Sequence, residues 1–202
     1  MYDTTTDNVI TSIEKRKTEF EKKRIVLTFD DGPSRVLDQI LDCLLAEDVQ
    51  AAFFWQSKLL HYKRPWKRVI EEGHVIGTHT CKHPNLVRMT RQQQLQELRF
   101  SKEKIERITG AEVNYFRPPF GQYNSDTIKV ANKLQLTTVM WRVASLDWEL
   151  KDNPDKIMSY VLDNLEDGAI ILLHELRQTV NVLPDLIKEI KKNGYDLTLF
   201  DF

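Results

Sequence analysis

Short apolar runs that alternate with longer helical patterns constrain the fold of this chain more than any other feature. The runs are rich in β-branched and aromatic residues and predict seven strands, at residues 25–29, 51–55, 75–78, 115–117, 137–142, 169–173 and 196–200. Apolar residues at helical spacing predict helices between them, for example at residues 37–46, 90–108 and 180–192. Strands joined by helical crossovers indicate a parallel sheet. The sequence therefore predicts a single α/β domain, either an incomplete barrel or an open doubly wound sheet.

The composition excludes several classes of protein. The chain has 202 residues, 41% of them hydrophobic, and its 29 basic and 30 acidic side chains leave a net charge of −1. This balance differs from that of disordered chains and of general nucleic-acid binders. No apolar run approaches the roughly 20 residues that span a bilayer, and two cysteines are too few for a disulfide framework. We expect a globular monomer with no nucleic-acid partner and no membrane span.

The first 23 residues differ in character from the rest. They are polar and then strongly charged, and they contain no apolar stretch suited to a signal peptide. We expect residues 1–23 to form a solvated leader, with a charged helix or a stalk as alternatives, and residues 24–202 to form the domain. As written, the chain would remain in the cytoplasm. If a targeting segment had been trimmed, the protein would belong to the cell envelope or the exterior.

Two carboxylates follow the first predicted strand, at the kind of position where parallel α/β folds place their functional groups. These are Asp30 and Asp31. Neighbouring residues of an extended chain point to opposite sides, so we expect different roles for them, one as a metal ligand and the other as a base. The alternative is a turn that leads into a helix.

Two histidines follow the third predicted strand. His79 and His83 are four residues apart, a spacing that lets two imidazole nitrogens face one ion across a helical turn. Cys81 lies between them and is expected to point away from the pair. Two surface histidines around a turn are the alternative.

Three further strand ends carry polar groups. The fourth predicted strand runs into Arg117-Pro118-Pro119-Phe120-Gly121, a rigid loop that could hold a backbone N–H in place as an oxyanion donor. The guanidinium of Arg117 could form paired hydrogen bonds with a carboxylate. Asp147 follows the fifth predicted strand, and His174 ends the sixth. A carboxylate near such a histidine can orient the ring and raise its pKa. An ordinary rigid turn and a satisfied core histidine are the alternatives.

Taken together, these motifs resemble the polysaccharide deacetylase family, the carbohydrate esterases of family four. The five motifs occur in the family's order and are Thr28-Phe29-Asp30-Asp31-Gly32-Pro33, His79-Thr80-Cys81-Lys82-His83-Pro84, Arg117-Pro118-Pro119-Phe120-Gly121, Asp147-Trp148 and Leu172-Leu173-His174. The flanking strands and helices suit the family's distorted (β/α)₇ barrel. The resemblance therefore favours an α/β barrel in a single domain.

The resemblance implies a metal centre and a base. Asp31, His79 and His83 would bind one divalent ion, usually zinc, with Co²⁺, Mn²⁺ or Ni²⁺ as alternatives. Asp30 would be the general base, and Arg117 would pair with it.

The resemblance also implies an acid and a substrate pocket. Asp147 would orient His174 as the general acid, and Phe120 would contribute its backbone N–H to the oxyanion site. Trp148 and Leu172 would form the small pocket for the acetyl methyl group.

Three positions depart from the family's pattern. Ala144 replaces a frequent aspartate, which leaves open how the loop before Asp147 is held. Phe120 replaces a frequent tyrosine, although the implied role uses only its backbone. Cys81 occupies a position that is usually bulkier, so metal preference and sensitivity to oxidation stay open.

The function implied by the resemblance is removal of N-linked acetyl groups from N-acetylglucosamine-type glycans such as peptidoglycan or chitin. Aromatic and basic side chains after the second predicted strand could line a glycan cleft and favour an anionic polymer, or could belong to a solvated helix face with a tryptophan anchored in the core. They are Lys58, Tyr62, Lys63, Arg64, Trp66, Lys67 and Arg68. An O-acetyl esterase acting on a glycan such as xylan and a catalytically silent glycan-binding barrel are the alternative functions.

Overall fold

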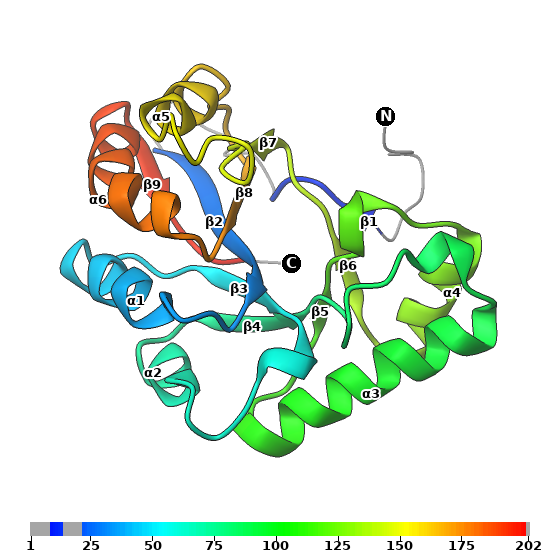
Figure 1. Ribbon diagram of the computed structural model, residues 1–202. Coiled ribbons are helices and arrows are strands. Elements are labelled where there is room, and N and C mark those ends of the chain that lie inside the picture. Colours follow the sequence, from blue (N-terminus) through cyan, green and yellow to red (C-terminus); the bar gives the residue numbers. More distant parts are fainter. Residues whose placement is uncertain (1–8, 14–21, 201–202) are drawn as a thin grey trace.

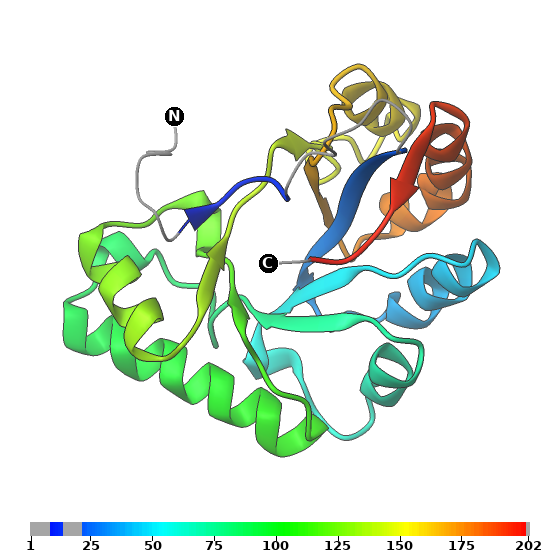
Figure 2. The same cartoon turned by 180° about the vertical axis from the view of Figure 1, so that it is seen from behind.

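A curved parallel sheet forms the centre of the computed structural model, which describes residues 9–13 and 22–200 (Figures 1 and 2). Within these residues the sheet has nine strands, and eight of them follow the order β1-β6-β5-β4-β3-β2-β8-β7, while β9 pairs with β2. The strands are β1 (Val9–Ile10), β2 (Lys23–Gly32), β3 (Ala52–Trp55), β4 (Val75–Thr78), β5 (Tyr115–Phe116), β6 (Thr137–Val139), β7 (Val143–Ala144), β8 (Ile170–His174) and β9 (Tyr195–Leu197). This arrangement confirms the predicted distorted barrel in one domain.

Helices cover the outside of the sheet (Figure 1). They are α1 (Leu37–Ala46), α2 (Trp66–Glu71), α3 (Arg91–Thr109), α4 (Ser125–Lys133), α5 (Asp155–Leu162) and α6 (Arg177–Lys192). The predicted helix at 37–46 is confirmed, and the one at 180–192 begins three residues earlier. Thr90 is the N-cap of α3 and forms a capping box with Gln93, and Gly110 ends the helix in the left-handed conformation (φ 73°). None of the helices in the described ranges is long and apolar enough to cross a membrane.

Each of the seven predicted strands overlaps an observed one, and two of them end three residues earlier than expected. The strand expected at 137–142 ends at Val139, because the carbonyls of Val139 and Met140 accept hydrogen bonds from the Arg117 guanidinium. The chain then crosses to β8, where residues 143–144 form β7. The strand expected at 196–200 is shorter and shifted, since β9 pairs only with the first residues of β2.

Residues 9–13, within the predicted leader, complete the barrel wall. β1 pairs with β6, and the backbone N–H of Met140 donates to the carbonyl of Ile10 at 2.7 Å. Ser12 forms a bridge with Ala169, and Ile13 is buried. This segment therefore lies between β6 and the start of β8 and is not a solvated leader. The rest of the leader up to residue 21 lies outside the described residues, and the division at residue 23 stays a prediction.

The residues of β2 alternate between two apolar layers. Ile25, Leu27 and Phe29 belong to the large core beneath the helices. Val26 belongs to a smaller cluster inside the barrel. Because side chains alternate along a strand, Thr28 and Asp30 share the inner face with Val26. The barrel interior therefore changes from apolar to polar toward the carboxyl end of β2.

Candidate active site

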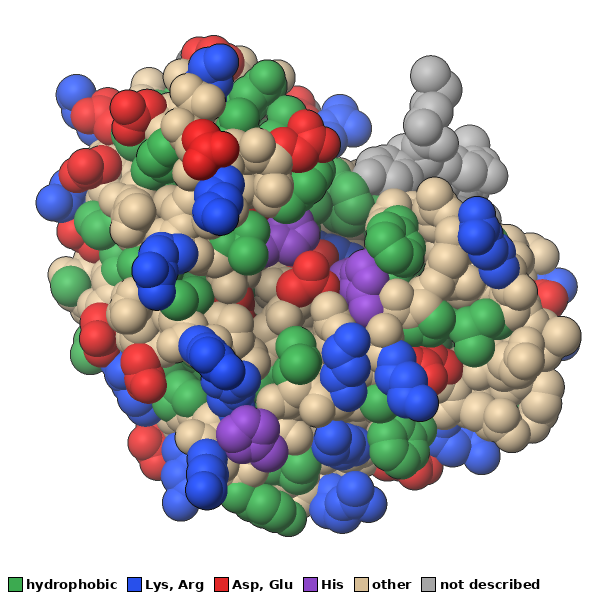
Figure 3. Space-filling model, viewed as in Figure 1, with side chains coloured by type: hydrophobic (Ala, Val, Ile, Leu, Met, Phe, Trp, Pro, Cys, Tyr) green, Lys and Arg blue, Asp and Glu red, His purple; other side chains and the backbone are tan. Residues whose placement is uncertain are grey.

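The carboxyl ends of the strands surround a cavity of about 390 Å³. Eight of the ten predicted site residues line it, namely Asp30, Asp31, His79, His83, Phe120, Trp148, Leu172 and His174. The other two, Arg117 and Asp147, are fully buried behind it. Figure 3 shows the acidic and histidine side chains gathered at the centre of this face. Chain segments far apart in sequence thus bring all the predicted groups together.

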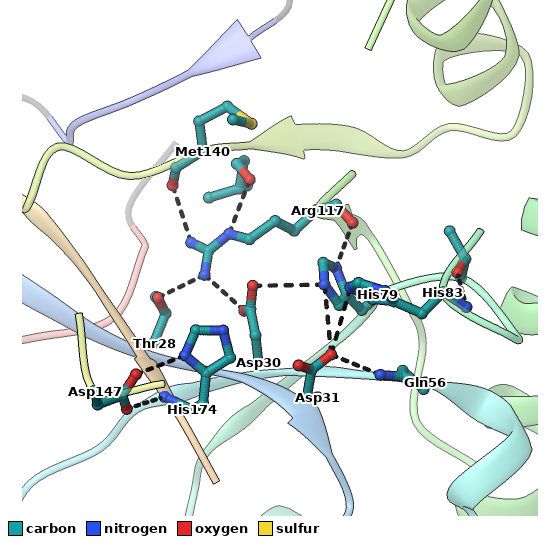
Figure 4. Close-up of polar contacts among 12 residues, drawn as sticks. Thr28, Asp30, Asp31, Gln56, His79, His83, Arg117, Met140, Asp147 and His174 are labelled. Atoms are coloured by element: carbon teal, nitrogen blue, oxygen red, sulfur yellow. Dashed lines mark hydrogen bonds and ion pairs between the residues drawn. The ribbon is translucent and has the colours of Figure 1, made fainter. Parts of the chain in front are cut away.

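Asp31 occupies a bulge at the end of β2. The register between β2 and β3 shifts between Asp30 and Gly32, and Asp31 has the left-handed backbone conformation (φ 66°). The expectation that the two carboxylates point to opposite sides is therefore wrong. Oδ2 of Asp30 lies 3.7 Å from Nε2 of His79, and Oδ1 of Asp31 lies 3.8 Å from the same nitrogen (Figure 4).

His79 is held in one tautomer by the backbone. Its Nδ1 lies 2.7 Å from the carbonyl oxygen of Arg117, and because a carbonyl only accepts, Nδ1 carries the proton. In the neutral ring, Nε2 then carries the free lone pair, and it faces Asp31. His83 places its own Nε2 3.6 Å from Oδ1 of Asp31. The two histidines are not related by a helical turn as predicted, because Thr80 and His83 both have positive φ in an irregular loop.

Electrostatics favour the cation-binding forms of two of these side chains, Asp31 and His83. Burial disfavours the charged form of Asp31, but His79, a hydrogen bond from Gln56 and His83 together hold its pKa below the ordinary value. Burial and the neighbouring His79 lower the pKa of His83, which favours the neutral ring. Metal ions bind deprotonated carboxylates and neutral imidazoles. Both shifts therefore favour the ligand forms.

The geometry fits a single metal ion. One ligand atom from each of Asp31, His79 and His83 lies within 4.8 Å of the other two. Bonds of 2.0–2.1 Å in a tetrahedral site place ligand atoms roughly 3.3–3.4 Å apart, so small side-chain movements would close the site. Two nitrogens and one carboxylate oxygen are a set of protein ligands typical of catalytic zinc. Cys81 is buried and does not belong to this group.

Arg117 is a buried cation whose donors are satisfied by the barrel interior. Nη1 donates to Oδ1 of Asp30 at 2.8 Å and to the hydroxyl of Thr28 at 2.7 Å. The guanidinium carbon lies 4.2 Å from the centre of the Phe54 ring. These contacts fix the orientation of the Asp30 carboxylate, which leaves its Oδ2 facing His79.

Asp147 holds His174 from behind. Oδ1 of Asp147 lies 2.7 Å from Nδ1 of His174, and Oδ2 accepts from the backbone N–H of His174 and from the hydroxyl of Thr179. Burial disfavours the charged ring, but the hydrogen bond and the charge of Asp147 outweigh it and raise the pKa of His174. His174 and Asp30 are register partners on β8 and β2, so both side chains face the cavity.

The loop before Asp147 is held without the aspartate that Ala144 replaces. The backbone N–H of Ser145 donates to the carbonyl of Leu172, and its hydroxyl accepts from the backbone N–H of Asp147. The amide of Gln178 donates to the carbonyl of Asp147. Backbone and α6 contacts therefore fix this loop.

Aromatic rings form part of the cavity wall. Phe120 takes a left-handed conformation (φ 59°), and its ring centre lies 4.5 Å from that of His83. Trp148 packs edge-on against His174 at 5.1 Å. Trp141 also lines the cavity. Neither Trp141 as a wall residue nor Gln56, whose amide donates to Asp31 at 2.6 Å, was predicted from the sequence.

The aromatic and basic residues after β3 lie outside this wall. The cavity-lining residues include none of the seven named above. Trp66 packs against the main core, and Arg68 bonds Asp38, Asp42 and Glu72. For these two residues the structure supports the helix-face alternative.

Comparison with known proteins places this arrangement in a family. The sequence profile named "Polysaccharide deacetylase" matches residues 17–139. This chain belongs to the polysaccharide deacetylase family. It is 34% identical over 187 residues to the peptidoglycan-N-acetylmuramic acid deacetylase PdaA of Bacillus subtilis, covering 90% of this chain and 71% of the relative.

Solved structures of family members share the fold. The Bc1960 peptidoglycan N-acetylglucosamine deacetylase superimposes with a TM-score of 0.86 and 30% identity, over 95% of this chain and 90% of that chain. BA3943 of Bacillus anthracis, described as a pseudoenzyme of the same family, superimposes with a TM-score of 0.86 and 27% identity, over 94% and 66% of the two chains. Membership in the family alone therefore does not establish activity, which depends on the residues that line the cavity.

Proposed function

We propose that this chain is a divalent-metal-dependent hydrolase that removes N-acetyl groups from the amino sugars of peptidoglycan or a related glycan. One observation carries the proposal. The Asp31/His79/His83 group, the Asp30–Arg117 pair and the Asp147–His174 pair all meet at one cavity. A glycan-binding barrel without activity would not require a ligand set, an oriented carboxylate and an oriented imidazole at the same place.

The side chains support distinct roles in amide hydrolysis. A divalent ion at Asp31, His79 and His83 would supply Lewis-acid chemistry to the acetyl carbonyl and to water. Asp30, oriented by Arg117, is placed to accept a proton from water. His174, whose pKa Asp147 raises, is placed to donate a proton to the departing nitrogen. Trp148, Leu172 and the Phe120 loop would enclose the acetyl group.

The relatives favour the amide over the ester. PdaA and the Bc1960 protein are named as deacetylases of peptidoglycan N-acetylmuramic acid and N-acetylglucosamine, respectively. An amine leaves poorly unless it is protonated, so the Asp147–His174 pair suits N-deacetylation. An O-acetyl esterase would need this acid less.

The test is an acetate-release screen on zinc-loaded protein. The substrates are peptidoglycan, a chitooligosaccharide and acetylated xylan, and mass spectrometry of the glycan products locates each lost acetyl group. We expect release from N-acetylated sugars and a free amine in the product. Release from xylan alone would identify an O-acetyl esterase, and no release from any substrate would favour the silent barrel.

A further inference from the structure

Glu175 is a buried carboxyl that the proposed reaction does not use. It follows His174 at the end of β8, and only 4% of the residue is exposed. Oε2 accepts a hydrogen bond from the backbone N–H of Ser34 at 2.6 Å, and Oε1 accepts one from Nε1 of Trp55 at 2.9 Å. Its own backbone N–H donates to the carbonyl of Asp30 at 3.3 Å. One residue therefore joins β8, β3 and the loop that follows β2.

Because Gly32 has no side chain, the carboxyl group of Glu175 can occupy the space beside its Cα. A Cβ added at Gly32 would lie 1.7 Å from Oε1 of Glu175 and 2.7 Å from Cδ1 of Trp55. On its other side, the carbonyl of Gly32 accepts from the backbone N–H of Gln56 at 2.9 Å. Gly32 is thus held between the carboxyl and the end of β3.

Asp31 lies between two fixed points of the backbone. Asp30 is in register with His174 of β8, while Gly32 and Ser34 are held by the contacts just described. A non-glycine residue with positive φ persists only where its surroundings over-determine it. The contacts of Glu175 supply that constraint next to Asp31 (φ 66°).

We propose that Glu175 is a positioning residue for the metal site, whose carboxyl holds the bulge after Asp30 so that Asp31 faces His79 and His83. This inference rests on the proposed metal-dependent function. Residues that orient metal ligands affect metal affinity by about 10–100-fold when they are changed. Glu175 acts through the backbone on either side of Asp31, in contrast to Gln56, which bonds the Asp31 carboxylate itself.

The test measures zinc affinity by competition with a chromophoric chelator at about pH 8. Burial raises the pKa of Glu175 to about 7, although the hydrogen bonds from Ser34 and Trp55 oppose this, so the wild-type carboxyl is ionised there. Glu175→Gln keeps the shape but replaces one acceptor by an NH₂ group, which must face one of two N–H donors. We expect zinc binding to weaken by about 10–100-fold, with a native circular dichroism spectrum.

Glu72→Gln is the matched control, because Glu72 accepts a 2.6 Å hydrogen bond from Arg68 at the end of α2, away from the cavity. We expect it to bind zinc as the wild type does.

A change in zinc affinity below about fivefold for Glu175→Gln would overturn the proposal. If Glu175→Gln does not fold, zinc affinity is measured for Gly32→Ala with the same fivefold threshold. This variant displaces the Glu175 carboxyl without removing a polar group. Loss of folding in both would also overturn it, since Glu175 would then be required for folding rather than for aiming Asp31. Zinc affinity is measured without substrate, so a failure of acetate release is a separate result.

Discussion

Asp30 and Asp31 are neighbours in the sequence, yet their carboxylates approach the same atom, Nε2 of His79, at 3.7 and 3.8 Å. In a regular strand they would point to opposite faces. The bulge at Asp31 turns both toward one cavity, while Arg117 holds only Asp30. In the proposed reaction, one short stretch of chain would thereby provide both a metal ligand, Asp31, and a separate carboxylate for proton transfer, Asp30.

Asp30→Asn tests the role of the base. The amide keeps an oxygen that can accept from Arg117 but cannot take a proton from water, so we expect acetate release to fall by about 10²–10⁴-fold. Zinc content should stay at the wild-type level, because Asp30 is not among the three proposed ligands. Near-normal turnover by the zinc-loaded variant would remove Asp30 from the role.

Arg117→Leu tests the buried ion pair. The substitution leaves the buried Asp30 carboxylate without its cation and Thr28 without a donor. Breaking a buried pair in this way costs about 3–5 kcal/mol in the free energy of unfolding. Urea denaturation of the metal-free protein measures this. A loss below about 1 kcal/mol, the range of exposed pairs, would show that the barrel interior does not depend on the pair.

His174→Ala tests the leaving-group acid. We expect a much larger loss of activity on a chitooligosaccharide than on nitrophenyl acetate, because the activated ester needs no proton on its leaving group. Both rates are measured on the same zinc-loaded sample. An equal loss on the two substrates would assign His174 a different role.

Asp147→Asn tests the pH dependence. In the wild type, Asp147 raises the pKa of His174, so the acid form persists above the ordinary value of 6.5 and is lost as pH rises through the raised pKa. Without the charge of Asp147, the alkaline limb of kcat/KM should move to lower pH. The stability that the pair provides should be present below pH 6.5 and disappear through the same raised pKa. A pH profile unchanged in the variant would contradict this coupling.

Much of the barrel could be predicted because each element carries its own local signal. Short apolar runs identify β2, β3, β4 and β8, and Thr90 and Gly110 mark the two ends of α3. Motifs at the strand ends predict the ten candidate residues that the structure brings to one cavity or directly behind it. Each of these sequence signals lies within a few residues of the strand, helix end or strand-end residue that it predicts.

The differences arise where distant segments decide the local conformation. β1 forms because residues 9–13 fit between β6 and β8, and the strand after Thr137 ends because Arg117 binds the next carbonyls. Among the described residues, seven non-glycine residues have positive φ, and five of them flank or line the cavity, namely Asp31, Thr80, His83, Phe120 and Leu146. Sequence periodicity contains no signal for such conformations, since tertiary contacts impose them.

The dependence of acetate release on zinc tests the central claim most directly. Protein stripped with a chelator is titrated with zinc, and acetate release from an N-acetylated glycan is measured beside the Asp31/His79/His83 triple alanine variant. We predict that the stripped protein is inactive, that activity saturates at one equivalent of zinc, and that the triple variant neither binds zinc tightly nor regains activity. Full acetate release by the stripped protein, or a full equivalent of tightly bound zinc in the triple variant, would contradict it.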